Sequence, residues 1–290
     1  MLCNLCPRKC NAPRGKDSSK GYCKMPLEPV LAKAMLHFGE EPVISGKNGS
    51  GAVFFSGCSL RCVFCQNFEV SRGNKGKKIT VLRLAEIFKE LEQKGAHNIN
   101  LVTPSHYAYA IRSALEIYRP NIPIVYNSSG YDSLYELDLL KDYIDIYLFD
   151  LKYLDKSRAK KYSKAEDYPQ TALSAIEYAY NLKSKPILEN GLLKSGIIIR
   201  HLLMPAATNE AIRIFDCVNE KFSNAIFSIM SQYSPRGEAY KYKEINRLVT
   251  KREYEKVLDY IINSGFKNCY FQELESSKED MIPDFDLSGV

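Results

Sequence analysis

The chain has 290 residues, of which 45% are hydrophobic and 26% are charged, and its net charge is +6 at pH 7. This composition is that of a globular protein with a sizeable core, and no run approaches the roughly 18 apolar residues of a membrane span. The first ten residues also lack the apolar stretch of a signal peptide, so we expect a cytoplasmic protein. The modest, scattered charge argues against nucleic-acid binding, which needs a basic stripe.

Four cysteines near the beginning of the chain, Cys3, Cys6, Cys10 and Cys23, have the spacing Cys-x2-Cys-x3-Cys-x12-Cys. In a reducing compartment, cysteines are better metal ligands than disulfide partners. Four thiolates at such spacings can bind zinc tetrahedrally or hold a [4Fe-4S] cluster. Because this stretch has little apolar content, we predict a small cysteine-rich metal-binding segment over residues 1–28, with the choice between the two metals open.

Residues 29–50 are predicted to connect the cysteine-rich segment to the first strand. Within them, residues 37–42 read His-Phe-Gly-Glu-Glu-Pro. This stretch can pack the cysteine-rich segment against the rest of the fold, contribute acid and base groups to substrate binding, or form a solvated turn before Pro42.

The apolar run at residues 51–56 is followed directly by Cys58, Cys62 and Cys65, in the spacing Cys-x3-Cys-x2-Cys. Three thiolates fill three irons of a [4Fe-4S] cube and leave the fourth iron open to a ligand that does not come from the protein. An open iron indicates chemistry, whereas a closed set of four cysteines indicates electron storage or structure. The alternatives are a zinc knuckle and buried thiols.

Apolar runs of strand length then alternate with amphipathic stretches of helix length, which indicates an α/β fold with a parallel sheet. Six such units are too short for a closed eight-unit barrel, so we predict a partial (β/α)6 TIM-like barrel over residues 51–272 and an acidic tail or strap over residues 273–290. The strands are predicted at residues 51–56, 98–103, 122–126, 144–150, 196–203 and 225–231, and the helices at residues 80–94, 106–118, 133–143, 168–183 and 208–222.

The carboxyl ends of the strands of such a barrel form one rim, where catalytic groups gather. Arg200 and His201 are neighbours within the fifth strand, so one of them points into the barrel and the other points out. The polar residues that follow the second, third and fourth strands are Ser105 and His106, Asn127 and Ser128, and Asp150 and Lys152.

The sequence from Phe54 to Asn67, with Phe64 directly before the third cysteine, resembles the radical S-adenosylmethionine (SAM) superfamily, and within it homologues of pyruvate formate-lyase activating enzymes. The resemblance covers roughly residues 3–233. It implies a [4Fe-4S] cluster whose open iron binds the amino and carboxylate groups of SAM, and one-electron cleavage of SAM to a 5′-deoxyadenosyl radical that abstracts a hydrogen atom. It also implies an electron donor of the flavodoxin or ferredoxin type.

The resemblance further implies which rim residues contact SAM. Asp150 and Lys152 match an Asp-x-Lys that contacts SAM in activating enzymes, with a simple ion pair as the alternative. Asn127 and Ser128 are expected at the ribose, with a turn as the alternative. His201 is favoured over its neighbour, because activating enzymes place a histidine near SAM in this part of the barrel, with a packing residue as the alternative.

At one position the chain departs from the pattern. Many radical SAM proteins have a Gly-Gly-Glu segment after the second strand, which receives the amino group of SAM, whereas this chain has Thr103-Pro104-Ser105-His106. Ser105 or the carbonyl group of Thr103 is expected to take that role, and His106 either caps a helix or faces substrate.

Three functions are consistent with these patterns. The leading hypothesis is an enzyme that abstracts hydrogen from a glycine of a partner protein and thereby activates a glycyl radical protein. The second keeps the radical chemistry but directs it at a small molecule or a peptide. The third is a non-catalytic zinc-binding interaction module, which would contain zinc at both cysteine groups and would leave SAM intact.

Overall fold

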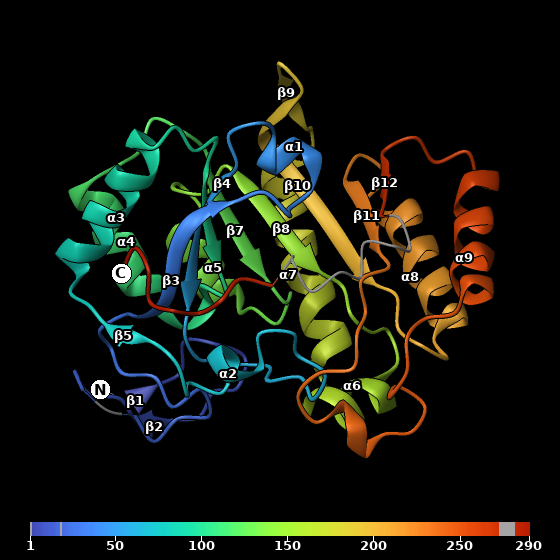
Figure 1. The fold of residues 1–290 in the computed structure, drawn as a ribbon, viewed down its shortest axis with the longest axis horizontal. Helices are drawn as coiled ribbons and strands as arrows, with labels where there is room; N and C mark the ends of the chain where they lie inside the picture. Colours follow the sequence, from blue (N-terminus) through green and yellow to red (C-terminus); the bar gives the residue numbers. More distant parts are fainter. Residues whose placement is uncertain (1, 18, 273–281) are drawn as a thin grey trace.

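The computed structural model describes residues 2–17, 19–272 and 282–290, and within them the main feature is an open, mostly parallel sheet (Figure 1). Its strands lie in the order β12-β11-β10-β8-β7-β6-β4-β3-β5, and β9 pairs with β10. The strands of the sheet are β3 (Val30–His37), β4 (Ser50–Phe55), β5 (Lys77–Lys78), β6 (Ile99–Val102), β7 (Ile124–Ser128), β8 (Ile146–Asp150), β9 (Ile187–Glu189), β10 (Leu192–Leu202), β11 (Ile226–Met230) and β12 (Cys269–Phe271).

From β4 to β12 each neighbouring pair along the sheet is parallel, whereas β3 and β5 run antiparallel at one edge. Parallel strands require crossover connections, and helices supply most of them. Several of these helices begin at a residue whose side chain caps the first turn, among them Thr80, Ser133 and Thr250. They are α3 (Val81–Gln93), α4 (Ala108–Ile117), α5 (Leu134–Leu140), α6 (Lys156–Ser163), α7 (Tyr168–Lys183), α8 (Thr208–Lys221) and α9 (Lys251–Asn263).

The alternation of side chains along each strand divides the core into an outer and an inner layer. On the outer face, residues such as Leu101, Tyr126 and Phe149 pack against the long helices. On the inner face, a second apolar cluster joins Val125, Ile146, Leu148, Ile198 and Ile226 to Val43 and Ile44 of the short helix α1 (Pro42–Ser45). Helix α1 therefore closes one end of the hollow that the curved sheet surrounds.

The predicted α/β class and the parallel sheet are confirmed, and the sheet does not close into a barrel in the residues that the structure describes. The six predicted strands and five predicted helices all occur, with their ends shifted by a few residues. The structure adds β3, β12, α6 and α9, which the sequence analysis did not predict. Residues 29–50 are therefore more than a connection, because β3 pairs with β4 along most of its length.

The N-terminal cysteine-rich segment packs against the loop that carries the cysteine triplet. It contains a small two-stranded sheet of β1 (Leu2–Cys3) and β2 (Ala12–Pro13). The guanidinium of Arg8 donates hydrogen bonds to the carbonyl oxygens of Ser59 (2.8 Å) and Ser163 (3.0 Å). In return, Arg61 of the triplet loop donates to the carbonyl oxygen of Tyr22 at 3.1 Å. The two cysteine groups therefore belong to one packed unit.

Residues 282–290 of the predicted tail lie along β3, and the remainder of that tail, residues 273–281, is outside the described residues. The Nζ of Lys33 donates to the carbonyl oxygen of Asp284 at 2.6 Å and lies 3.1 Å from the Asp286 carboxylate. The rings of Phe54 and Phe285 meet edge to face, with centroids 5.4 Å apart. Residues 282–290 thus act as a strap over the inner face at the β3 edge. No helix among the described residues is long and apolar enough to span a membrane.

Replacing Phe285 with alanine tests whether this strap stabilises the fold. The half-buried ring contacts Phe54, so we expect Phe285→Ala to lower the free energy of unfolding by about 1–2 kcal/mol. Tyr240→Ala is the matched control, because the Tyr240 side chain is 65% exposed and its loss should change stability by no more than about 0.5 kcal/mol. Anaerobic urea unfolding followed by circular dichroism measures both, and equal effects would contradict a stabilising strap.

Candidate active site

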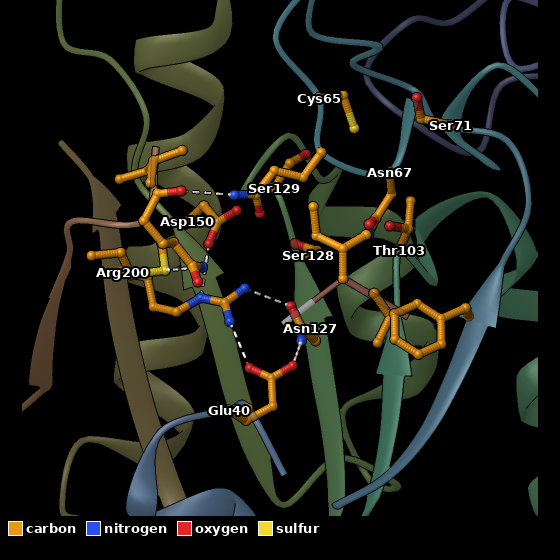
Figure 2. A pocket seen from close by; sticks show the side chains of 18 of the residues that line it. Glu40, Cys65, Asn67, Ser71, Thr103, Asn127, Ser128, Ser129, Asp150 and Arg200 are labelled. Carbon is orange, nitrogen blue, oxygen red and sulfur yellow. Dashed lines mark hydrogen bonds and ion pairs between the residues drawn. The ribbon is translucent and has the colours of Figure 1, made fainter. Parts of the chain in front are cut away.

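A cavity of about 510 Å³ opens on the inner face of the sheet (Figure 2). Its walls come from the ends of β4, β6, β7, β8, β10 and β11 and from the triplet loop, and Ile282 and Pro283 of the strap also contribute. Figure 2 shows Cys65 on one side of the cavity and Glu40 on the opposite side, with Asn127, Asp150 and Arg200 between them. The cavity therefore extends from the cysteine triplet to the floor that α1 forms.

The triplet loop leaves β4 through a tight turn at Gly57. This residue has a positive φ of 81°, and a Cβ atom there would lie 2.2 Å from Cγ of Met25. Only glycine combines this backbone conformation with such close packing. The turn brings Cys58, Cys62 and Cys65 to the cavity wall, as the sequence predicts for a loop after the first strand.

The surroundings of the three sulfurs suit thiolates that hold a metal cluster. The backbone N–H groups of Leu60 and Arg61 donate to Sγ of Cys58 at 3.3 and 3.4 Å. The hydroxyl group of Ser163 donates to Sγ of Cys62 at 3.1 Å, and burial raises the pKa of that thiol to about 12. Burial without a bound cation therefore keeps Cys62 protonated, whereas hydrogen-bond donors to sulfur are what iron–sulfur cysteines typically receive.

The residues present thus fit an iron–sulfur cluster in their chemistry. In the part of the chain that the structure describes, no group of three Cys, His, Asp or Glu side chains stands in an arrangement that could hold a metal ion. The fit lies in the donor set, three cysteines in one loop at the cavity wall.

A network of buried charged groups lies across the cavity from the triplet. The guanidinium of Arg200 donates to the Asp150 carboxylate, to Glu40 and to the side-chain oxygen of Asn127, each at 2.8 Å. Lys152 donates to the other oxygen of Asp150 at 2.7 Å. Arg200 therefore connects β10 to β8, β7 and the segment before α1.

The charges of this network fix the ionisation of Asp150. Burial alone would raise the pKa of Asp150, but the positive charges of Arg200 and Lys152 outweigh it and hold the pKa below its usual value. Asp150 is thus an anion at neutral pH. Its contribution to stability is present above the pKa of an unfolded aspartate and is lost as the pH falls through the lowered value.

Four of the predicted SAM-contacting residues line the cavity, namely Asn127, Ser128, Asp150 and Lys152. Ser105 does not, because its hydroxyl group donates to the buried Asp132, which also accepts from Ser128. Ser105 therefore belongs to a polar cluster behind the cavity wall.

The structure corrects the choice between Arg200 and His201. Alternation along β10 turns Arg200 inward, and His201 points to the outer side, where its Nδ1 is 2.8 Å from the carbonyl oxygen of Leu151. Burial lowers the pKa of His201 to about 4, so it is a neutral packing residue. His106 is likewise buried, with Nε2 at 2.7 Å from the carbonyl oxygen of Ser56, and does not line the cavity.

The four N-terminal cysteines do not line the cavity. Cys6 and Cys23 are buried, Cys3 is half-buried and Cys10 is exposed. The guanidinium of Arg14 is 3.8 Å from Sγ of Cys3, and the Tyr22 N–H donates to Sγ of Cys10 at 3.3 Å. These contacts favour thiolates, but a second metal site stays a prediction.

Several cavity residues were not singled out from the sequence as site residues. Arg200 is the neighbour of His201 that the family resemblance disfavoured, and Tyr270 lies on β12, a strand that was not predicted. Thr103, whose carbonyl group the sequence suggested for the amino group of SAM, does line the cavity. Its φ of 61° is a left-handed conformation that is rare for a β-branched residue and frequent at functional sites. The sequence offers no signal for that conformation, since glycine is the residue expected there.

The model of the radical SAM superfamily matches residues 52–213, which is more than half of the chain, so the chain belongs to that superfamily. Uncharacterized protein MJ0674 of Methanocaldococcus jannaschii is 31% identical over 269 residues, which cover 89% of this chain and 73% of that protein. The cysteine triplet lies inside the matched region, and the family implies a [4Fe-4S] cluster and SAM at this site.

Two solved structures share the fold. SuiB of Streptococcus suis, bound to precursor peptide SuiA, has a TM-score of 0.52 and 16% identity, over 76% of this chain and 48% of that one. HydG, a maturase of the [FeFe]-hydrogenase, has a TM-score of 0.52 and 15% identity, over 78% of this chain and 52% of that one. The chain spans about half the length of these proteins, and at such identities the likeness is one of fold alone.

The Ser163 hydroxyl group is expected to tune the cluster. Removing a donor to the Cys62 sulfur disfavours the reduced, more negative cluster, so Ser163→Ala should lower the reduction potential. A hydrogen bond of about 1 kcal/mol corresponds to about 40 mV for one electron. A redox titration followed by electron paramagnetic resonance measures this shift. Ser174→Ala, on the exposed side of α7, is the control, and an unchanged potential in Ser163→Ala would contradict the assignment.

Arg200 is expected to be essential for stability. Arg200→Met leaves the carboxylates of Asp150 and Glu40 buried without their main counter-charge, so it should cost about 3–5 kcal/mol of unfolding free energy. Denaturant unfolding checks this, with Arg252→Met on the exposed side of α9 as the control. If both variants lose the same small amount, the network does not stabilise the protein.

Proposed function

We propose that this protein cleaves SAM reductively at a [4Fe-4S] cluster held by Cys58, Cys62 and Cys65 and uses the radical to abstract a hydrogen atom from a substrate. The observation that carries the proposal is that the three cysteines face Asp150, Lys152 and Asn127 across one cavity at the carboxyl ends of parallel strands. When bound, the cluster supplies the electron that breaks a carbon–sulfur bond of SAM.

The chain's own residues then bind and orient SAM. The Lys152 ammonium group, held by Asp150, can pair with the SAM carboxylate, and the Asn127 side chain and the backbone of Ser128 can contact the ribose hydroxyl groups, since the Ser128 hydroxyl group donates to Asp132. Apolar residues around them, among them Phe54, Phe64 and Leu202, keep water away from a reactive radical. Binding, orientation and exclusion of water are the tasks that cofactor chemistry leaves to the protein.

The electron is proposed to come from a flavodoxin or ferredoxin-type donor in the cytoplasm. Lys9, Lys16, Lys20 and Lys24 are exposed on the N-terminal segment, which packs against the triplet loop. A donor with an acidic surface would be attracted to this side of the molecule, and close approach to the cluster is what electron transfer needs.

Activation of a glycyl radical protein, the role of the activating enzymes that the sequence resembles, stays one candidate for the final step. The charged groups at the inner end of the cavity favour the second candidate, a small molecule or a side chain that carries polar groups. An extended glycine-containing loop would offer the buried carboxyl groups of Glu40 and Glu41 little beyond backbone N–H groups.

The test is SAM cleavage by the anaerobically purified protein. With dithionite and SAM, the wild type should form 5′-deoxyadenosine, and Cys62→Ala should form none above background. Cys217→Ala is the matched control, because Cys217 lies on α8 away from the cavity and should retain wild-type cleavage. A colourless zinc protein that leaves SAM intact would instead support the non-catalytic interaction module.

Metal analysis tests the second site, which we propose at Cys3, Cys6, Cys10 and Cys23. One cluster at the triplet gives about 4 iron atoms per chain, and the second site should add either one zinc or about 4 further iron atoms. Cys6→Ala should lose only that additional metal. If the metal content of Cys6→Ala equals that of the wild type, the second site does not exist.

A further inference from the structure

The inner end of the cavity has more carboxyl groups than cations. Among the described residues that line the cavity, Glu40, Glu41 and Asp150 are acidic, whereas Lys152 and Arg200 are basic. Lys152 pairs with Asp150, and the three donor nitrogens of Arg200 are directed at Asp150, Glu40 and Asn127. The remaining carboxyl group, that of Glu41, has only a long ion pair with Arg200 and receives no hydrogen bond from a cation.

Glu41 is buried, but one oxygen of its carboxyl group receives no hydrogen bond. It is 8% exposed and lies at the N-terminus of α1, at the floor of the cavity. Its nearest cation is Arg200, with Nη1 at 3.9 Å, too far for a hydrogen bond. Its Oε2 has no hydrogen-bond partner. Burying a carboxyl oxygen without a partner is costly, so such an atom at a cavity wall indicates a ligand that donates to it.

The neighbouring groups make this end of the cavity a site for a hydrogen-bond donor. Glu40 already accepts from Asn100, Asn127 and Arg200. The side-chain oxygen of Asn100, a fully buried residue next to it, also has no partner. Ser228 and Tyr270 line the cavity beside Glu41, and their hydroxyl groups can accept as well as donate. Two buried oxygens at this end, Oε2 of Glu41 and the side-chain oxygen of Asn100, therefore have no hydrogen-bond donor, and that of Glu41 belongs to a residue that lines the cavity.

We propose that Glu41 binds a positively charged N–H group of the substrate, a guanidinium or a primary ammonium group, at the floor of the cavity. Burial raises the pKa of Glu41, and the positive charge of a bound ligand favours its ionised form. The N–H groups of the ligand donate to the Glu41 oxygen that has no partner. This inference rests on the proposed function in one respect: it takes the bound cation to be part of the molecule that loses the hydrogen atom. The substrate would thus be a small amine or guanidine, or a peptide residue with such a side chain.

The site also fixes the direction in which such a substrate binds. With its cationic end at Glu41 and the cysteine triplet at the other end of the cavity, its carbon chain points toward the place where SAM is expected. Anchoring one end of a substrate is how an enzyme selects which C–H bond comes within reach of a reactive atom. Glu41 is therefore a specificity-determining residue in this proposal.

The test uses butylguanidine and butylurea, which have nearly the same shape but differ in charge. Binding to the anaerobic, cluster-containing protein with SAM present is measured by calorimetry at constant ionic strength. We expect the wild type to bind butylguanidine at least tenfold more tightly than butylurea. Glu41→Gln should lose that preference, whereas Glu177→Gln, which removes an exposed carboxylate on α7, should retain it.

Two results would overturn the inference: a wild type that does not prefer butylguanidine, or a preference that survives in Glu41→Gln. The first result is measured on the wild type alone, so the proposal stays testable even if Glu41→Gln does not fold. Because the binding measurement involves no SAM cleavage, the two proposals can fail separately. A wild type that prefers butylguanidine but forms no 5′-deoxyadenosine retains the cation site and overturns the proposed function.

Discussion

The buried ion pairs of Arg200 are the interaction on which the rest of the site depends. One guanidinium, reaching inward from β10, binds a carboxylate on β8, an amide on β7 and a glutamate in front of α1. These contacts attach the floor of the cavity to its wall and fix Asp150 as an anion that orients Lys152. Burial of these charges is costly, and the network offsets the cost only while every partner is present.

The same inner face explains how one cavity can serve two ligands. Toward the carboxyl ends of the strands it has thiols and polar groups suited to a cluster and SAM, and toward α1 it has an excess of carboxyl groups. The radical SAM superfamily provides the first of these ends. The second end comes from a segment, residues 37–42, that precedes the region matched by the family model. Residues outside the family's shared domain are thus proposed to determine the substrate of this chain.

Much of the fold could be predicted from sequence, because strand-length apolar runs and capped helices are local signals. β3 was not predicted because Lys33 interrupts its apolar pattern. The partners of that buried lysine, Asp284 and Asp286, lie about 250 positions later in the chain. At the site, the cysteine spacing predicted the triplet, and the family resemblance predicted the Asp150–Lys152 pair. The sequence could not decide between Arg200 and His201, because the alternation of side chains shows that two neighbours face opposite sides of a strand but not which one faces inward.

The proposed chemistry requires that the triplet holds a cluster with an iron that is open to SAM. The most direct test is the electron paramagnetic resonance spectrum of the dithionite-reduced protein before and after SAM is added. We expect the signal of a reduced [4Fe-4S] cluster that changes when SAM binds and that is absent from a variant in which Cys58, Cys62 and Cys65 are all replaced by alanine. A triplet-dependent cluster signal that SAM leaves unchanged, or no such signal at all, would contradict it.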